Sequence, residues 1–358
     1  MNQQTMQHSL SRRQFLSAAA TVALVGLAGS LIACSDKKGD NNQTENGGTP
    51  NAEPITFVFL PDSSSADMAE SRQAVAEAIK AACGREARIM TTTDYNVGIE
   101  AISSDNVAMG LYGAEGYIQA NRKNSKVQAV FTNSDDNGSL DLACYYSRIC
   151  VRLEDVDEYR SGSGFTLQPL KGKSFSFVSA TSTSGFKVPS SIIVAEFGLE
   201  NNESLLENGA FFSEVLFGGS HQGSVVNLVS GDADAAAFDD IDVDMYLDLV
   251  SGEANMPGSI YRVSDDAGDP FTRVRGQQFI ILASTPVLNA PFVINENLIS
   301  PEERDAIVSY FCSDAVANDK RIFRDPDDET KTLYTKKTTH TRFVPVTDSW
   351  YDPLRRIG

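Results

Sequence analysis

The stretch that decides the fold is residues 177–189, which read FVSATSTSGFKVP. An apolar strand ends here, a hydroxyl-rich turn follows, and a helix begins. The first N–H groups of a helix have no partner inside it and carry a partial positive charge. The hydroxyls of Ser182, Thr183 and Ser184 add donors, and Gly185 allows close backbone approach. The turn therefore predicts an anion-binding site, although an ordinary N-cap with spare hydroxyls has the same spacing.

Strands and helices alternate on both sides of this turn. Strands are predicted at 55–60, 88–91, 107–111, 126–131, 143–152, 174–179, 233–238 and 278–283. Helices are predicted at 63–83, 95–103, 186–197, 223–230 and 300–317. A polar loop at 154–169 separates two such runs. This order indicates an α/β fold with mostly parallel sheets and helices on both faces.

A second glycine- and hydroxyl-rich segment, GGSHQGS at 218–224, also precedes a helix. A single histidine is usually structural or on the surface, but this position favours contact between His221 and a ligand. The chain has three histidines and no C-x-x-C pair, which excludes a multi-histidine metal site and a zinc ribbon. We therefore expect neither a metal ion nor a cofactor.

Acidic residues dominate the charge of the chain. Its 358 residues include 48 Asp and Glu against 30 Lys and Arg, a formal net charge of −18. Phosphate backbones and anionic lipid surfaces attract basic faces, so we expect neither nucleic-acid binding nor electrostatic docking on lipid.

The N-terminus has the pattern of an export signal. Residues 11–16, SRRQFL, match the twin-arginine pattern, an apolar run follows, and residues 31–34 read LIAC. This arrangement resembles bacterial lipoprotein signals, which implies removal of 1–33, a lipid on Cys34, and a flexible tether at 34–53. The alternative is an uncleaved anchor helix. Either way, the folded part is expected at the cell membrane, facing the extracytoplasmic side.

Six motifs, in order over about residues 54–356, resemble the phosphate/phosphite/phosphonate-binding proteins of ABC importers. They are TDY at 93–95; LYG at 111–113 through Tyr117; LKGKSF at 170–175 with STSG at 182–185; GSH at 219–221 with GDADAAA at 231–237; STPVLNAPF at 284–292; and FVPVTD at 343–348 with YDP at 351–353.

The resemblance implies a two-lobed, type II periplasmic-binding-protein-like fold with a ligand cleft between lobes joined by two crossing strands. Lobe one would comprise 54–147 and 281–358, and lobe two 148–280. The lobes would close around the ligand by a hinge.

The resemblance also implies the ligand-binding residues. Ser182, Thr183, Ser184 and His221 would hold the anion from lobe two. Tyr95 would hold it from lobe one and form an aromatic wall with Tyr112 and Tyr117. Asp239, at the end of a strand, would face the cleft, because ligands bind beyond the carboxyl ends of strands in such sheets.

Two positions depart from the family pattern. Ala290 stands where the aminophosphonate-binding branch tends to have an acid, although Asp239 or Asp240 could partly replace it. We therefore rank phosphite, phosphate and a small alkylphosphonate above aminoethylphosphonate. Glu115 lies in a loop that more often has serine, and we expect its side chain to point away from the cleft.

The resulting prediction is a monomeric, non-enzymatic substrate-binding lipoprotein whose partners are an ABC permease and ATPase. The alternatives are a secreted hydrolase of phosphate esters and a ligand-sensing lipoprotein without a transporter. No G-x-S-x-G elbow or G-x-x-x-x-G-K-[ST] loop occurs, so nucleotide hydrolysis would belong to a partner subunit. For the cysteines beyond Cys34, a Cys83–Cys312 disulfide and four buried thiols both remain open.

Overall fold

The computed structural model describes residues 53–63 and 66–357. The predicted signal peptide, Cys34 and all but the last residue of the predicted tether lie outside this part of the chain. Within it, no helix is long and apolar enough to cross a membrane. The four described cysteines are free thiols, and only Cys150 among them is buried.

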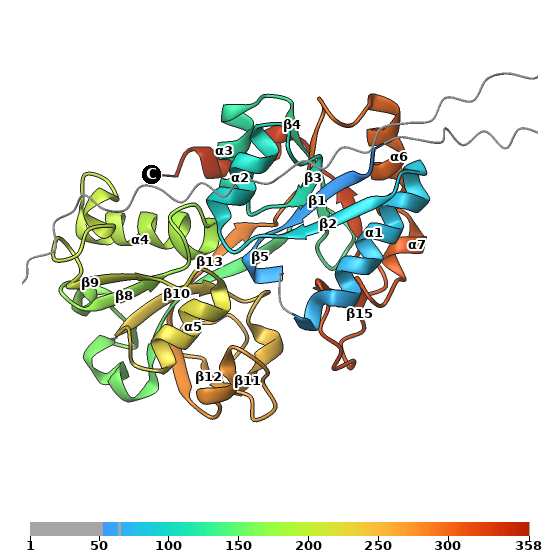
Figure 1. The fold of residues 1–358 in the computed structure, drawn as a ribbon. Coiled ribbons are helices and arrows are strands. Elements are labelled where there is room, and N and C mark those ends of the chain that lie inside the picture. Colours follow the sequence, from blue (N-terminus) through green and yellow to red (C-terminus); the bar gives the residue numbers. More distant parts are fainter. Residues whose placement is uncertain (1–52, 64–65, 358) are drawn as a thin grey trace, which may run out of the picture. The chain divides into compact units, whose positions relative to one another are not determined.

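Two β-sheets organise the fold (Figure 1). The first has the order β17-β4-β14-β3-β1-β2. Its strands are β1 (Ile55–Phe59), β2 (Ala87–Thr91), β3 (Met109–Leu111), β4 (Val127–Asn133), β14 (Phe292–Asn295) and β17 (Phe343–Pro345). This sheet forms lobe one.

The second sheet forms lobe two and has the order β11-β12-β13-β5-β10-β8-β9. Its strands are β5 (Cys144–Arg152), β8 (Ser174–Phe177), β9 (Glu214–Phe217), β10 (Ala235–Asp239), β11 (Leu247–Ser251), β12 (Ile260–Val263) and β13 (Gln278–Leu288). Two further pairs of short strands lie outside these sheets. They are β6 (Arg160–Ser161) with β7 (Gly164–Phe165), and β15 (Phe323–Arg324) with β16 (Tyr334–Thr335).

Helices cover both faces of each sheet. In lobe one, α1 (Ala69–Cys83), α6 (Pro301–Phe311) and α7 (Asp314–Ala317) contribute to one buried cluster; α2 (Tyr95–Ser103), α3 (Ala114–Lys123) and α8 (Asp352–Arg355) contribute to the other. In lobe two, α4 (Val188–Phe197) and α5 (His221–Val229) lie on opposite faces.

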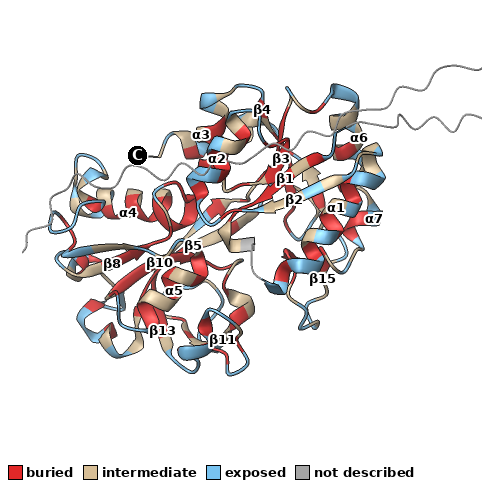
Figure 2. Cartoon of the chain, in the orientation of Figure 1, coloured by how far each residue is buried: buried red, intermediate tan, exposed pale blue. Residues whose placement is uncertain are grey.

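Period-two alternation in the strands explains the two faces of the lobe-two sheet. On β10, Ala235 and Ala237 pack in the cluster with α4, whereas Ala236 and Phe238 pack in the cluster with α5. Successive strand side chains point to opposite faces, so a strand covered on both sides is apolar throughout. Figure 2 accordingly shows β8 and β10 as buried strands.

The chain crosses between the lobes on two paired strands. β5 enters the second sheet after β4, and β13 leaves it before β14; the two pair antiparallel from Cys144 with Leu288 to Arg152 with Phe279. The structure is thus a two-lobed type II fold. The lobe boundaries predicted at 147/148 and 280/281 fall inside these strands and stay a prediction.

The expectation of mostly parallel sheets is wrong. Strands β1, β2 and β3 pair in parallel, as do β8, β9 and β10, but all other neighbours in the two large sheets are antiparallel. In lobe one, β14 re-enters the sheet from lobe two and runs against both β3 and β4. In lobe two, the consecutive strands β11, β12 and β13 pair antiparallel with one another.

Candidate functional site

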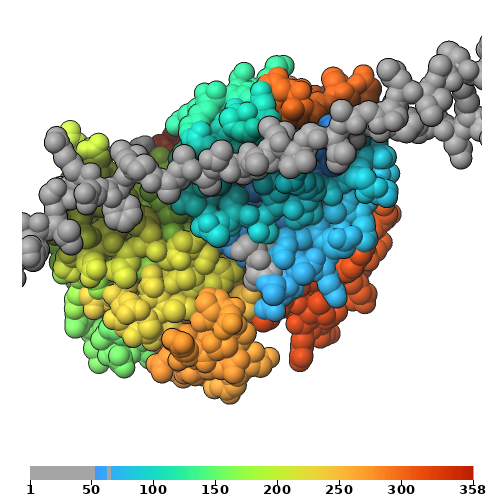
Figure 3. Space-filling view, viewed as in Figure 1, coloured from blue at the N-terminus to red at the C-terminus, as the bar shows by residue number. Residues whose placement is uncertain are grey.

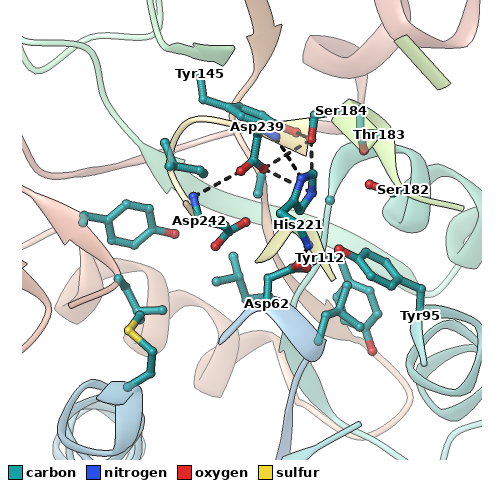
Figure 4. Close-up of a pocket in the computed structure, with 18 of the residues that line it drawn as sticks. Asp62, Tyr95, Tyr112, Tyr145, Ser182, Thr183, Ser184, His221, Asp239 and Asp242 are labelled. Carbon is teal, nitrogen blue, oxygen red and sulfur yellow. Dashed lines mark hydrogen bonds and ion pairs between the residues drawn. The ribbon is translucent and has the colours of Figure 1, made fainter. Parts of the chain in front are cut away.

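A small cavity lies where residues of both lobes meet, with a volume of about 60 Å³. Its polar side carries Tyr95, the hydroxyl turn 182–184, and His221 with Asp239 (Figure 4). Its lining also includes apolar side chains, those of Leu60, Met68, Leu111, Ile241, Met245 and Leu333. The cavity therefore fits a compact ligand that can form hydrogen bonds and also contact apolar side chains.

The hydroxyl turn begins a helix, as its sequence predicts. The Ser182 hydroxyl accepts a hydrogen bond from the Gly185 N–H at 3.1 Å and so acts as the N-cap. A π-helical turn over Thr183–Lys187 then leads into α4. Wide turns of this kind occur frequently at functional sites. The Ser184 hydroxyl faces the cavity, 3.2 Å from the Tyr145 hydroxyl.

Thr183 joins the two lobes. Its hydroxyl accepts a hydrogen bond from the Glu115 N–H, in the first turn of α3, at 2.8 Å. Gly113 makes this approach possible, because a Cβ there would lie only 2.9 Å from Thr183 Oγ1. The N-terminal ends of α3 and of the π-helical turn that precedes α4 therefore meet at the cavity.

His221 is the first residue of α5, whose N-cap Ser220 accepts from the Gly223 N–H at 3.0 Å. The Asp239 N–H donates to His221 Nδ1 at 2.9 Å, so Nδ1 carries no proton and Nε2 is the donor. Nε2 lies 3.2 Å from Asp239 Oδ2 and 3.4 Å from the Ser184 hydroxyl. The backbone thus fixes the tautomer that presents a donor to the cavity.

Lobe one contributes Tyr95 and Tyr112. Tyr95 is the first residue of α2, and its hydroxyl donates to Asp62. Burial, followed by the charge of Asp62, raises the pKa of Tyr95 well above its usual value, so the phenol stays a donor. The Tyr112 hydroxyl donates to the Gly98 carbonyl at 2.8 Å, and Tyr112 lines the cavity.

Tyr117 lies elsewhere. It is absent from the cavity lining; its hydroxyl donates to Asp348 at 2.6 Å and its ring packs against Tyr351, with centroids 5.4 Å apart. The prediction of Tyr117 in the aromatic wall does not fit this placement, because α3 turns the residue away toward α8. Glu115 also lies outside the lining, and its carboxylate accepts from Gln119 on the same helix.

Several cavity residues were not predicted from the sequence. Asp62 follows the carboxyl end of β1, which the rule for ligand positions in α/β sheets could have indicated. Asp242 follows β10 in the same way. Tyr145, on the crossing strand β5, and Tyr334, on β16, carry no local signal. Asp240 is outside the lining and instead accepts from the Tyr146 N–H at 2.8 Å.

Two cavity carboxyl groups have perturbed acidity. Burial, with the charges of Asp62 and Asp240 adding to it, raises the pKa of Asp239 well above its usual value. Burial also raises the pKa of Asp242, and Asp239 and Asp62 contribute further. Perturbed carboxyl groups gathered in an enclosed cavity are typical of functional sites.

Asp62, His221 and Asp242 each place a ligand atom within 4.8 Å of the others, the spacing of a cation site. Asp62 already accepts from Tyr95 and from the His221 N–H, and His221 Nε2 contacts Asp239. Two of the three ligand atoms therefore already have partners within the protein.

The N-cap of α2 positions Tyr95 and offers a first test. Asp94 accepts from the Asn96 N–H at 2.7 Å and from the Val97 N–H at 3.3 Å. Replacing Asp94 by alanine should lower the free energy of unfolding by about 1 kcal/mol, the usual loss for an N-cap. Urea unfolding measures this, with Asp136→Ala on an exposed turn as the control. Equal stability of the two variants would contradict the capping role.

Two α/β lobes that bring helix N-termini together around a small polar cavity define the substrate-binding component of an ABC importer. The chain belongs to the family described as ABC transporter, phosphonate, periplasmic substrate-binding protein, which matches residues 57–351. This family is a component of a transporter and not an enzyme, so the protein acts outside the cytoplasm with ABC transporter subunits and not as a hydrolase.

Relatives agree with this assignment. The chain is 26% identical over 339 residues to the phosphate-import protein PhnD of Mycolicibacterium smegmatis, covering 95% of this chain and 94% of that one. A binding protein component of an ABC phosphonate transporter from Pseudomonas aeruginosa has a TM-score of 0.60 at 15% identity, covering 86% of both chains. PhnD1 of Prochlorococcus marinus, solved in complex with methylphosphonate, has a TM-score of 0.57 at 15% identity, covering 86% of this chain and 98% of that one. The two structures share the fold.

Proposed function

We propose that this protein is a lipid-anchored substrate-binding protein that delivers a small tetrahedral phosphorus oxyanion to an ABC permease. The observation that carries the proposal is the meeting of the 182–184 hydroxyls with His221 Nε2–H in a cavity of about 60 Å³. Hydroxyls and helix N-termini bind the oxygens of such an anion without a lysine or arginine. The ligand-binding residues are Tyr95, Tyr112, Ser182, Thr183, Ser184, His221 and Asp239.

Phosphite, phosphate and a small alkylphosphonate are the preferred ligands. The small cavity, whose lining includes the apolar side chains of Met68, Met245 and Leu333, leaves room for a hydrogen, hydroxyl or methyl as the fourth substituent. Ala290 lines the cavity and provides no carboxylate for an ammonium group. The relatives are consistent with this class, since one is named for phosphate import and another was solved with methylphosphonate.

The lipid on Cys34 and the tether at 34–53 would hold the protein near the permease. The alternative of a sensing lipoprotein is separated from a transport role by gene context. Genes for a permease and an ATPase beside this one favour the importer.

A thermal-shift panel on residues 35–358 tests the ligand class. Phosphate, phosphite, methylphosphonate, aminoethylphosphonate and sulfate are compared at equal concentration. Binding stabilises the folded state by mass action, by about 2.7 kcal/mol at a hundredfold excess over Kd, so the tightest ligand should raise the midpoint most. We expect one of the first three to do so. A panel without any shift would contradict the proposed function.

A further inference from the structure

The charges around the cavity are unusual for a site that receives an anion. Three carboxyl groups line it, those of Asp62, Asp239 and Asp242, and its lining, within the described residues, includes no lysine or arginine. His221 accepts at Nδ1 and is therefore a neutral donor. The favourable groups are thus uncharged N–H and O–H donors. The acids repel each additional negative charge on a ligand, and these donors offset only part of that repulsion.

Asp62 occupies two of those donors. It lies on the turn Pro61–Ser63 of lobe one, where one carboxylate oxygen accepts from the His221 N–H of lobe two at 2.8 Å. The other accepts from the Tyr95 hydroxyl. Figure 4 shows Asp62 below His221 and beside Tyr95. The carboxylate therefore uses the first N–H of α5 and the phenol of lobe one, both of which an oxyanion would otherwise take.

The contacts of Asp62 also link the lobes. Its backbone carbonyl accepts from the Gln222 side chain at 3.3 Å. The surfaces of α1 and of lobe two adjoin in the space-filling view (Figure 3). Nearby, Lys331 lies 4.2 Å from the Tyr246 ring centroid and 3.1 Å from Asp67, on the outer side of this junction. The lysine is thus paired outside the cavity and does not neutralise Asp62.

Asp239 and Asp242 lie beside one another. The Asp242 N–H donates to Asp239 at 3.1 Å, and the Ser184 hydroxyl donates to the other Asp239 oxygen at 3.3 Å. Among the described residues, the titratable groups that face them are His221, with Nε2 3.2 Å from Asp239, the Asp62 carboxyl group, and the phenols of Tyr95, Tyr145 and Tyr334; the charge of Asp240 also acts on Asp239. Since burial raises the pKa of both carboxyl groups, they gain negative charge as pH rises, and this weakens oxyanion binding further.

We propose that the cavity binds its oxyanion together with a proton, as a singly charged species with a P–OH group, and that Asp62 imposes this selection. The inference rests on the proposed function and names the ligand form. A P–OH group can donate to a carboxylate, which has no proton to give, whereas a fully ionised oxyanion can only repel it. Sites that hydrogen-bond a ligand proton reject analogues lacking it strongly.

The sign of the pH dependence follows. The second pKa of inorganic phosphate is roughly 7, somewhat above that of a phosphate ester, so the monoanion dominates near pH 5 and is the minor species near pH 8. Inorganic phosphate should therefore bind roughly five- to tenfold more weakly at about pH 8 than at about pH 5. At the higher pH the complex should take up close to one proton, measured by calorimetry in two buffers of different ionisation enthalpy.

Asp62→Asn is the deciding variant, because it removes the charge and keeps the shape. The amide oxygen can still accept from the His221 N–H. We expect Asp62→Asn to bind phosphate several-fold more tightly than the wild type at the higher pH, with a flatter pH profile and less proton uptake. Asp136→Asn, which removes the same charge on an exposed turn outside the cavity lining, is the control and should match the wild type. Thermal unfolding without ligand checks that each variant folds.

The possible results distinguish a failure of this inference from a failure of the proposed function. This inference is overturned, and the proposed function still stands, if phosphate binds as tightly or more tightly at the higher pH. It is also overturned if Asp62→Asn weakens phosphate binding equally at both pH values. Much tighter binding of aminoethylphosphonate also overturns it, because an ammonium group would then be the partner of the acids. Failure of phosphate, phosphite and methylphosphonate to bind at either pH overturns the proposed function itself.

Discussion

Replacing Arg148 by leucine should lower the free energy of unfolding by about 3 kcal/mol. Arg148 lies on the crossing strand β5 with its side chain fully buried, and it bonds both Asp244 oxygens, at 2.6 and 2.8 Å. It also donates to Asn255 at 2.7 Å and lies over the Tyr261 ring. Breaking a buried ion pair costs about 3–5 kcal/mol, and the low end applies because the Asp244 side chain is 39% exposed and can regain water.

Urea unfolding of the two variants Arg148→Leu and Arg262→Leu makes the comparison. Arg262 pairs with Asp248 at the partly exposed edge of the same sheet, so its loss should cost less than about 1 kcal/mol. Adding Asp244→Leu to Arg148→Leu should recover stability, since no unpaired carboxylate then remains. Equal losses for Arg148→Leu and Arg262→Leu would show that the pair contributes little to stability.

The elements with strong local signals were predicted well from the sequence. The helix expected at 95–103 is α2 with the same bounds, because Asp94 supplies an N-cap and the helix has a clear apolar face. The start at Ser300 is confirmed as a capping box with Glu303. Gly84 ends α1 in the left-handed conformation, as expected for a C-cap. In each case the residues that decide the element lie within it or next to it.

Helix α3 shows why other elements could not be predicted. Its N-cap position is Gly113, which has no side chain to accept from the first turn. The hydroxyl of Thr183 on the other lobe accepts from the Glu115 N–H instead, and these two residues are 68 positions apart in the sequence. A pattern search along the chain finds no start signal there, and the segment reads as a loop. The same holds for short strands such as β14 and β17, whose pairing depends on the return of the chain from lobe two.

The residues of the candidate site also divide into those with a local sequence signal and those without one. The helix starts at Ser182 and His221 have local signatures, and the structure brings both to one cavity. The strand-end position of Asp62 has a local signal, but its contact with His221 of the other lobe has none, and Tyr145 reaches the cavity only because β5 crosses between the lobes. The charge balance of the site, and with it the expected ligand form, therefore emerges only from the folded arrangement.

Replacing both Thr183 and Ser184 by alanine should weaken oxyanion binding by about 1–3 kcal/mol, roughly 5- to 150-fold. Ser184 is the buried hydroxyl at the meeting point of Tyr145, His221 and Asp239, and Thr183 lies beside it in the cavity wall. Hydrogen bonds to a charged group are worth more than those between neutral groups, so their loss falls mainly on the ligand. Losing Thr183 also frees the Glu115 N–H and loosens closure of the lobes.

The fold of the double variant should survive, because the bond from the Gly185 N–H to Ser182 remains and still caps the turn that leads into α4. Ser191→Ala is the matched control: this hydroxyl lies on α4 and donates only to the Val188 carbonyl, at 2.7 Å. Calorimetry with the ligand that gives the largest thermal shift should show wild-type affinity for Ser191→Ala and a clear loss for the double variant. Since the helix is intact in both, unchanged affinity of the double variant would place the oxyanion away from the hydroxyl turn.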